Sequence, residues 1–314
     1  MIKYLITGAT GAIGSALVRL LAAEGEEVRA FVRNSDKFHR LLPDVPAEVV
    51  TGNALNPDDV RQAVEGVEVI FHCVNFPITQ FERNLEAAKV LIEAASEGKP
   101  HIVFPGNTWV FGRPARTPIT PETPFNPPSS IARIKARVDE LLLGSGLPVT
   151  VVHLPDFYGP GVVNPLVRPL FENALAGKDI TFPAPVDVPH QFIYIDDAAR
   201  ALIAVAGQEA CFGKRYTVGG IEPITVRRFV ELIYRAAGTK GRVRGMPPWL
   251  LRLAGLFSAE ARAAAGIMHV FAWDTTMDGS ALRQDTGFVP QVGYEAGIRE
   301  TVAWFHKEQE GGER

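Results

Sequence analysis

Three glycines near the start of the chain have the spacing of a loop that holds phosphate groups. The stretch TGATGAIG places Gly8, Gly11 and Gly14 between the apolar run KYLITG and a segment whose apolar residues have helical spacing. There the glycines permit a tight turn, close approach of the backbone to a pyrophosphate and close helix–strand packing. The helix N-terminus also offers unpaired N–H groups to the phosphates. We expect a dinucleotide to contact Gly8, Ala9, Thr10, Gly11, Ala12, Ile13 and Gly14.

A basic residue ends the next apolar run, EVRAFVR. Many NAD sites carry Asp or Glu at this point, where the carboxylate accepts a hydrogen bond from the ribose 2′-hydroxyl. Here Val32 stands in that place and Arg33 follows it. A guanidinium can bind a 2′-phosphate through two hydrogen bonds, and Lys37 lies close enough in sequence to assist. The sequence therefore predicts NADP(H) as the cofactor, in preference to NAD(H).

Apolar runs alternate with amphipathic segments along the first half of the chain. This alternation predicts an α/β fold of the Rossmann type, with a doubly wound parallel sheet and a smaller C-terminal substrate lobe. We expect residues 1–154 to form the dinucleotide-binding domain, completed by parts of 190–220, and residues 155–314 to form mostly the lobe. The expected strands are Lys3–Gly8, Glu27–Arg33, Ala47–Asn53, Val67–Val74, His101–Asn107 and Pro148–Leu154.

Composition narrows the function classes. A net charge of −3 gives no general attraction to nucleic acid or to an anionic membrane. Two cysteines cannot build a disulfide framework or a thiolate metal site, so we expect a cytoplasmic protein without a structural metal. No apolar run is long enough to span a bilayer. The apolar segment Met246–Thr276 is expected to be helical, with a packing stripe of Trp249, Leu250, Leu253 and Leu256.

Several longer stretches resemble the extended short-chain dehydrogenase/reductase family, which includes NAD-dependent epimerases and dehydratases. They are VTGNALNPDDVRQAVEGVEVIFHCV, VFPGNTWVFG, LPDFYGPG, HQFIYIDDAARAL and TGFVPQVGYEAGIRETVAWF, in the family's order. The resemblance covers nearly the whole chain and implies the same fold and a nicotinamide dinucleotide cofactor. It also implies cofactor contacts from Asn53, Ala54, Cys73, Val74, Asn75, Lys135, Leu154 and Pro155.

The chain departs from the family pattern where the chemistry takes place. In this family a tyrosine, acidified by a lysine four residues later, exchanges a proton with the substrate oxygen. Lys135 is present, but Ile131 replaces the tyrosine, and Asn107, followed by Thr108, replaces the catalytic Ser or Thr. Asn53 stands where an Asp is usual. His190–Gln191 replaces Arg–Asp, which weakens the case for a diphosphate substrate because arginine binds diphosphate best.

If the protein is an enzyme, its proton must come from another group. Tyr158 is the first candidate, because its motif resembles the family segment that passes the nicotinamide. His190 is the second, because an imidazole exchanges protons near neutral pH. Thr108 would orient a carbonyl, Asn107 would donate a hydrogen bond, and Asp156 would orient His190 or a water. Lys135 would bind the ribose. Each of these residues is also compatible with a purely structural role.

Three functions remain open. The first is an NAD(P)-dependent oxidoreductase acting on a small, fairly apolar carbonyl or alcohol without the usual tyrosine. Its pocket would be lined by Trp109, Phe76, Phe157 and Phe182. The second is a nucleotide-sugar epimerase or dehydratase, with Arg168 as the remaining candidate clamp for a diphosphate. The third is a cofactor-binding sensor or scaffold without chemistry. The resemblance also implies a homodimer, with Ile134, Val138 and Leu141 on a helix that could supply the interface.

Overall fold

The computed structural model describes residues 3–247, 249–250 and 266–312. Its largest feature is a parallel sheet of seven strands in the order β11-β6-β5-β4-β1-β2-β3, and every adjacent pair is parallel. The sheet order reverses between β1 and β4, which places the ligand crevice of such folds at the carboxyl ends of these strands. The strands are β1 Tyr4–Thr7, β2 Val28–Val32, β3 Glu48–Thr51, β4 Val69–His72, β5 His101–Asn107, β6 Val149–Leu154 and β11 Arg215–Thr217.

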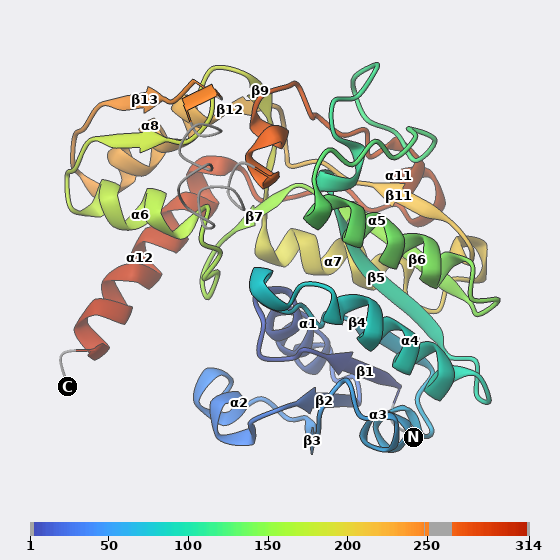
Figure 1. The fold of residues 1–314 in the computed structure, drawn as a ribbon. Coiled ribbons are helices and arrows are strands. Elements are labelled where there is room, and N and C mark those ends of the chain that lie inside the picture. Colours follow the sequence, from blue (N-terminus) through green and yellow to red (C-terminus); the bar gives the residue numbers. More distant parts are fainter. Residues whose placement is uncertain (1–2, 248, 251–265, 313–314) are drawn as a thin grey trace.

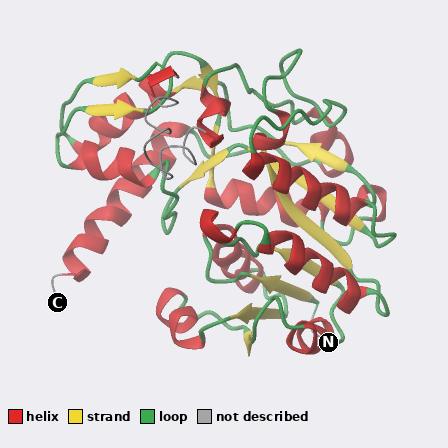
Figure 2. Ribbon diagram, viewed as in Figure 1, coloured by secondary structure: helices red, strands yellow, loops and turns green. Residues whose placement is uncertain are grey.

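Helices cover both faces of this sheet (Figures 1 and 2). One face packs against α1 Ala12–Ala23, α2 Ser35–Leu41 and α7 Ile195–Val205, and the other against α3 Pro57–Val64, α4 Arg83–Ala95 and α5 Ser130–Leu143. The strands are apolar on both sides because both sides are covered. The predicted Rossmann-type sheet is therefore confirmed. Strand β11 and helix α7, from the later part of the chain, belong to this layer arrangement.

A smaller lobe packs beyond the carboxyl edge of the sheet (Figure 1). Its core is rich in aromatic side chains, with the stacked rings of Phe192 and Phe229 at a centroid distance of 4.2 Å. Its elements are β7 Asp156–Tyr158, α6 Arg168–Leu175, β8 Ile180–Phe182, β9 Pro189–His190, β10 Phe192–Tyr194, β12 Ile224–Thr225, α8 Val226–Ala237, β13 Val243–Gly245, η4 Met268–Phe271 and α12 Tyr294–Gly312. The strands form three two-stranded pairs, β10-β7, β12-β9 and β13-β8. Four short elements connect the rest: η1 Ile78–Gln80, η2 Thr108–Phe111, η3 Glu209–Cys211 and α11 Ser280–Thr286.

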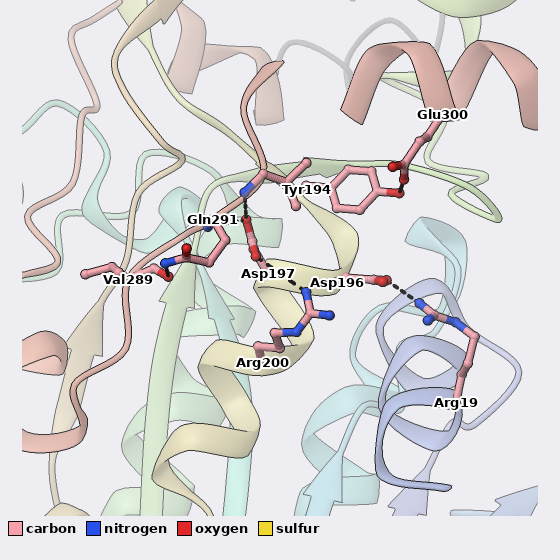
Figure 3. A network of polar contacts seen from close by, with 9 residues as sticks. Arg19, Tyr194, Asp196, Asp197, Arg200, Val289, Gln291 and Glu300 are labelled. Carbon is pink, nitrogen blue, oxygen red and sulfur yellow. Dashed lines mark hydrogen bonds and ion pairs between the residues drawn. The ribbon is translucent and has the colours of Figure 1, made fainter. Parts of the chain in front are cut away.

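The start of α7 holds the lobe to the sheet through two adjacent carboxylates (Figure 3). Asp196 forms an ion pair with Arg19 of α1. The buried Asp197 accepts hydrogen bonds from the backbone N–H groups of Gln291 and Val292, at 2.9 and 2.8 Å. A carboxylate in the first turn of a helix is also stabilised by the helix dipole. This junction fixes the approach to α12, and therefore the position of the lobe over the sheet edge.

One sequence expectation fails in the lobe. Trp249 and Leu250 are 63% and 39% exposed, so they do not form part of a buried packing stripe. Leu253 and Leu256 lie outside the described residues. On the sheet domain, Val138 of the expected dimer face is buried against the sheet, whereas Ile134 and Leu141 are half-buried. Within the described part of the chain, no helix is long and apolar enough to cross a membrane.

Candidate active site at the carboxyl edge of the sheet

The loop between β1 and α1 has the shape that a dinucleotide requires. Gly8 has a φ of 72°, and a Cβ there would lie 2.7 Å from the carbonyl oxygen of Cys73. A Cβ at Gly14 would lie 2.3 Å from the carbonyl oxygen of Gly8, so side chains are excluded from both positions. Gly11 is the N-cap of α1 and gives the helix no side-chain cap. The first N–H groups of α1 thus lack a capping side chain, which is what a bound pyrophosphate needs.

The end of β2 presents basic side chains to solvent. Val32 is buried, whereas Arg33 and Lys37 are exposed at the start of α2. The Asn34 side chain accepts a hydrogen bond from the Lys37 backbone N–H at 2.8 Å, which caps α2. Both predicted 2′-phosphate ligands, Arg33 and Lys37, are therefore exposed just after β2, and β2 itself ends without a carboxylate.

The loops after β3 and β4 carry the next group of cofactor candidates. Asn53 uses its side-chain oxygen to accept from the backbone N–H of Leu55, at 3.1 Å, so it shapes the turn that contains Ala54. Cys73 and Val74 are half-buried, and their backbone lies against Gly8 of the phosphate loop. These residues lie along the carboxyl edge of the sheet, beside the phosphate loop.

Lys135 of α5 reaches this edge from the opposite face. Its side chain is mostly buried, and its Nζ donates a hydrogen bond to Oδ1 of the exposed Asn75, at 2.9 Å. The ammonium group also lies 5.3 Å from the ring centroid of Phe81. Burial lowers the pKa of Lys135 to about 8, although the carboxyl group of Asp139 opposes part of this shift. A lysine with such a pKa can both donate and accept a proton near neutral pH.

The residues around Lys135 differ in how much chemistry they can perform. Asn107 ends β5, and its side-chain oxygen accepts from the backbone N–H of Trp109 at 3.0 Å, which caps η2. Thr108 is buried, with 1% of its surface exposed, and Ile131 is 8% exposed. Ile131 has no group that exchanges a proton. Lys135 Nζ lies 5.8 Å from the ring centroid of Phe104 in β5, the strand that ends at Asn107, and α5 contacts η2, which begins at Thr108.

The second pair of candidates, Asp156 and His190, forms a buried contact between β7 and β9. Asp156 Oδ2 lies 3.3 Å from His190 Nε2. His190 Nδ1 lies 3.0 Å from Oγ1 of Thr275, whose hydroxyl donates to the carbonyl oxygen of Val270. His190 Nδ1 is therefore a donor, and both ring nitrogens face protein atoms. This arrangement ties β9 to the segment after η4 and leaves His190 1% exposed.

Tyr158 lies in the core of the smaller lobe and has no exposed surface. Its ring contacts those of Tyr194, Phe229 and Tyr294, and its hydroxyl has no hydrogen-bond partner among the described residues. Burial raises the pKa of the Tyr158 phenol. These surroundings favour a packing role. Leu154 and Pro155, just before β7, are also buried.

Other predicted site residues are scattered. Arg168 pairs with Glu172 of its own helix and with Glu308 of α12, at 2.6 and 2.8 Å, so it is engaged away from the sheet edge. Of the aromatic residues expected in a pocket, Phe182 lies in the lobe core and Phe157 packs against the sheet-domain core. The ring centroids of Trp109 and Phe81 are 6.5 Å apart, and the Phe81 ring in turn lies beside Lys135 Nζ.

Sequence reasoning missed two buried ionisable residues, Asp139 on α5 and His153 on β6. Asp139 lies four residues after Lys135, which places it on the same face of α5. His153 is the one ionisable residue in the mainly apolar strand PVTVVHL. Both signals were present in the sequence, but an acidic residue on a helix is usually solvated, and nothing local indicates that this one is buried.

Comparison with known proteins agrees with this geometry. Residues 4–219 match the model of the NAD dependent epimerase/dehydratase family. The chain is 25% identical to the UDP-N-acetyl-alpha-D-glucosaminuronate decarboxylase of Bacillus cytotoxicus, over 97% of this chain and 98% of that protein. It is 30% identical to the ceramide reductase of Caulobacter vibrioides, over 79% of this chain and 72% of that protein.

Solved structures of the same fold extend over the smaller lobe as well. The dTDP-glucose 4,6-dehydratase of Bacillus anthracis in complex with NAD superposes with a TM-score of 0.82, covering 99% of this chain and 98% of that one at 21% identity. Because the family model spans well over half of the sequence and the fold matches throughout, the extended short-chain dehydrogenase/reductase assignment is confirmed. This chain belongs to the NAD dependent epimerase/dehydratase family.

Proposed function

We propose that this protein is a nicotinamide-dinucleotide enzyme that acts at a secondary alcohol or ketone carbon, with Lys135 as the proton-exchanging group. The observation that carries the proposal is the position of Lys135. Its Nζ is desolvated, hydrogen-bonded to Asn75 and next to the β4 loop that backs the phosphate loop. The bound dinucleotide would supply or accept the hydride. Lys135 would supply or accept the proton that the family takes from tyrosine.

The protonation state of Lys135 determines whether reduction or oxidation of the substrate is favoured at a given pH. Below a pKa of about 8 the amine is an ammonium that can donate to a carbonyl oxygen. Above that pH it is a neutral base that can accept the proton of an alcohol. Asn107 and Thr108, at the carboxyl end of β5, would help to orient the substrate oxygen. Reduction should therefore be favoured below about pH 8 and oxidation above it.

A nucleotide-linked sugar is the substrate class that the comparisons support best. The relatives include a decarboxylase of a UDP-sugar and dTDP-glucose 4,6-dehydratases, and the structural match covers the lobe that would hold the sugar nucleotide. The expectation of a small apolar carbonyl finds no support there. On such a substrate the cofactor would take a hydride and return it, so its reduction would be transient.

One feature of the site favours a second candidate, a lipid-like ketone. His190 and Gln191 stand in the place of the family's Arg–Asp pair, and both bind protein: His190 contacts Thr275, and Gln191 accepts from the Met277 backbone N–H at 2.8 Å. Neither can clamp a diphosphate as arginine does. The ceramide reductase relative fits this alternative.

A substrate panel separates the two candidates. The purified protein is incubated with NAD(P)⁺ and UDP-glucose or dTDP-glucose, and with NAD(P)H and long-chain 3-ketones, while nicotinamide absorbance is followed. A transient rise in NAD(P)H absorbance with the sugar nucleotides supports the first candidate. A steady loss of NAD(P)H absorbance with the ketones supports the second. No change in either set, with intact cofactor binding, would contradict the proposed chemistry.

NADP(H) remains our proposed cofactor within the nicotinamide dinucleotides. Arg33 and Lys37 are exposed beside β2, where a 2′-phosphate would lie, and Val32 leaves no acceptor for a 2′-hydroxyl. Arg33→Gln should weaken NADPH binding by roughly tenfold or more, because it removes one charge-assisted bidentate contact. NADH binding should be unchanged, because NADH has no 2′-phosphate. Arg40→Gln, which removes an exposed charge from the neighbouring helix α2, is the matched control. Tighter binding of NADH than of NADPH by the unaltered protein would refute the preference.

A further inference from the structure

An arginine and a tryptophan from distant parts of the sequence contact each other at the surface. Arg113 lies in the loop of residues 112–126, which follows η2, and Trp273 lies in residues 272–278, which follow η4. The guanidinium carbon of Arg113 is 4.2 Å from the ring centroid of Trp273. Arg113 is exposed and forms no ion pair within the described part of the chain, and Trp273 is 39% exposed. The cation is therefore held on a ring and is not neutralised by a carboxylate.

The loop that carries Arg113 is joined to the candidate site at both of its ends. Helix η2, which follows β5, comes directly before it, and α5, which carries Lys135, begins four residues after it. The backbone N–H of Asn126 donates to the carbonyl oxygen of Val110 at 2.9 Å, so the ends of the loop are held together. Gly112 has a φ of 59°, and a Cβ there would collide with the carbonyl oxygen of Asn126. Only glycine fits this turn, which leads directly into Arg113.

Residues 272–278 pack against this loop through the backbone. The N–H of Ile119 donates to the carbonyl oxygen of Thr276 at 2.7 Å, and the N–H of Asp278 donates to the carbonyl oxygen of Ile119 at 2.8 Å. The hydroxyl of Thr117 donates to the carboxylate of Asp274 at 3.3 Å. The two segments accordingly lie next to each other above the carboxyl edge of the sheet (Figure 1). The contact between the two side chains is thus supported by their backbones.

Trp273 is also held close to His190. Phe271 and Thr275, two residues to either side of Trp273, both contact this histidine. The ring centroids of Phe271 and His190 are 4.3 Å apart, and Thr275 Oγ1 lies 3.0 Å from His190 Nδ1. Two residues of chain span at most about 7 Å. The stack of Arg113 on Trp273 therefore lies beside the position where the family pattern has an arginine and this chain has His190.

We propose that Arg113, held on Trp273, is a specificity-determining residue that binds the diphosphate of a nucleotide-linked substrate. A guanidinium that covers a ring keeps N–H donors free at its edge, in the fork geometry that matches two phosphate oxygens. The ring also orders this long side chain before the ligand binds, so less rotamer entropy is lost on binding. This inference rests on the sugar-nucleotide candidate of the proposed function. It supplies, from another loop, the guanidinium that this candidate lacks at His190.

The other arginines considered for this task are engaged elsewhere or lack the ring. Arg168 forms ion pairs within the smaller lobe. Arg215 of β11 donates to the carbonyl oxygen of Pro121 at 2.7 Å and lies over the ring of Phe125, so it supports the loop. Arg116 is exposed three residues after Arg113 and stacks on no ring among the described residues. Arg116 is therefore the matched control.

The test measures ligand binding and requires no turnover. The full-length protein, saturated with whichever of NAD⁺ and NADP⁺ it binds more tightly, is titrated by calorimetry with UDP and dTDP. Uridine and thymidine, which lack the diphosphate, are titrated in parallel. Arg113→Gln should weaken binding of both diphosphates by roughly tenfold or more and leave binding of the nucleosides unchanged. Arg116→Gln should change diphosphate binding by about twofold at most. Because both side chains are exposed, the melting temperatures should be unchanged.

Two further variants separate the charge from the geometry. Arg113→Lys keeps the positive charge but loses the planar fork, so it should recover only part of the lost affinity. Trp273→Leu removes the ring and keeps the guanidinium, so UDP binding should weaken by about two- to fivefold. Unchanged UDP affinity in Arg113→Gln overturns the proposal. An equal loss in Arg116→Gln, or no binding of either diphosphate to the unaltered protein, also overturns it.

These outcomes are distinct from a failure of the proposed function. Lys135→Met should bind UDP as the unaltered protein does. With UDP-glucose as substrate, Arg113→Gln should raise KM and leave kcat within a few fold, whereas Lys135→Met should lower kcat. If Lys135→Met kept full turnover while Arg113→Gln lost UDP affinity, the role of Lys135 would fail and this inference would stand. If Lys135→Met lost turnover while Arg113→Gln kept full UDP affinity, this inference alone would fail.

Discussion

Replacing Lys135 with methionine should change how the stability of the protein depends on pH. In the folded protein burial lowers the pKa of Lys135 to about 8, whereas in the unfolded chain it has the ordinary lysine value of about 10.4. Between these values the unfolded chain binds more protons than the folded protein, so the free energy of unfolding rises with pH. Lys135 therefore destabilises the fold below pH 8, and this penalty fades above it.

The size of this effect follows from the two pKa values. Raising the pH from 8 to 10 should stabilise the unaltered protein by about 2 kcal/mol relative to Lys135→Met, because the variant lacks the titrating group. Asp139 acts in the same direction, since its pKa rises further in the variant when the neighbouring cation is lost. The other lysines and the tyrosines are present in both proteins, so their contributions to the pH dependence cancel in the difference between the two free energies of unfolding.

The measurement is urea-induced unfolding of both proteins at a series of pH values, with the free energy of unfolding extrapolated to water. The difference between the two free energies should change by about 2 kcal/mol across this range. Parallel stability curves would refute the reasoning, because they would show that Lys135 titrates alike in the folded and unfolded states. Arg137→Gln provides a control for a charge change on the same helix.

Three further substitutions test the assignment of roles. Ile131→Tyr places a phenol in a position that is 8% exposed, so turnover should stay flat or fall, and a large gain with simple ketones would show a degraded version of the usual site. Tyr158→Phe removes a buried hydroxyl without a partner among the described residues, so the melting temperature should stay the same or rise and turnover should not change. A loss of turnover of roughly 10²-fold or more would instead identify Tyr158 as the general acid. His190→Gln breaks the contact with Thr275, so it should cost about 1–3 kcal/mol of stability with cofactor affinity unchanged, as checked by calorimetry; unchanged stability would contradict a bracing role.

The sequence was most informative where local pattern and topology coincide. Apolar runs buried on both faces predict parallel strands, and the glycine spacing at Gly8 and Gly14 predicts the cradle that the backbone forms. These features depend on neighbours in the chain or on a repeated topology, so a pattern of residue types is sufficient to predict them. Lys135 and Asn75 were expected at the cofactor site only from the family resemblance, and the structure joins them by a hydrogen bond of 2.9 Å.

Tyr158 shows where that logic ends. In a strand Asp156 and Tyr158 point to the same side, and the sequence does not say which later segment covers that side. The structure covers Tyr158 with α12, where a Cβ at Gly297 would lie 2.7 Å from the phenol oxygen. Such a contact depends on the path of a distant helix. His190 is similar, since its partner Thr275 follows η4 and no spacing rule connects the two.

The central claim, that Lys135 exchanges the substrate proton in a dinucleotide-dependent reaction, is tested most directly by the pH dependence of turnover in the unaltered protein and in Lys135→Met, both saturated with cofactor. In the reductive direction with the substrate found in the panel, turnover of the unaltered protein should fall as the pH rises through about 8, where Lys135 loses its proton. Lys135→Met should lose roughly 10²–10⁴-fold in turnover, the usual effect of removing a general acid, and should show no such step. Turnover of Lys135→Met within a few fold of the unaltered protein, with the same step retained, would contradict the account.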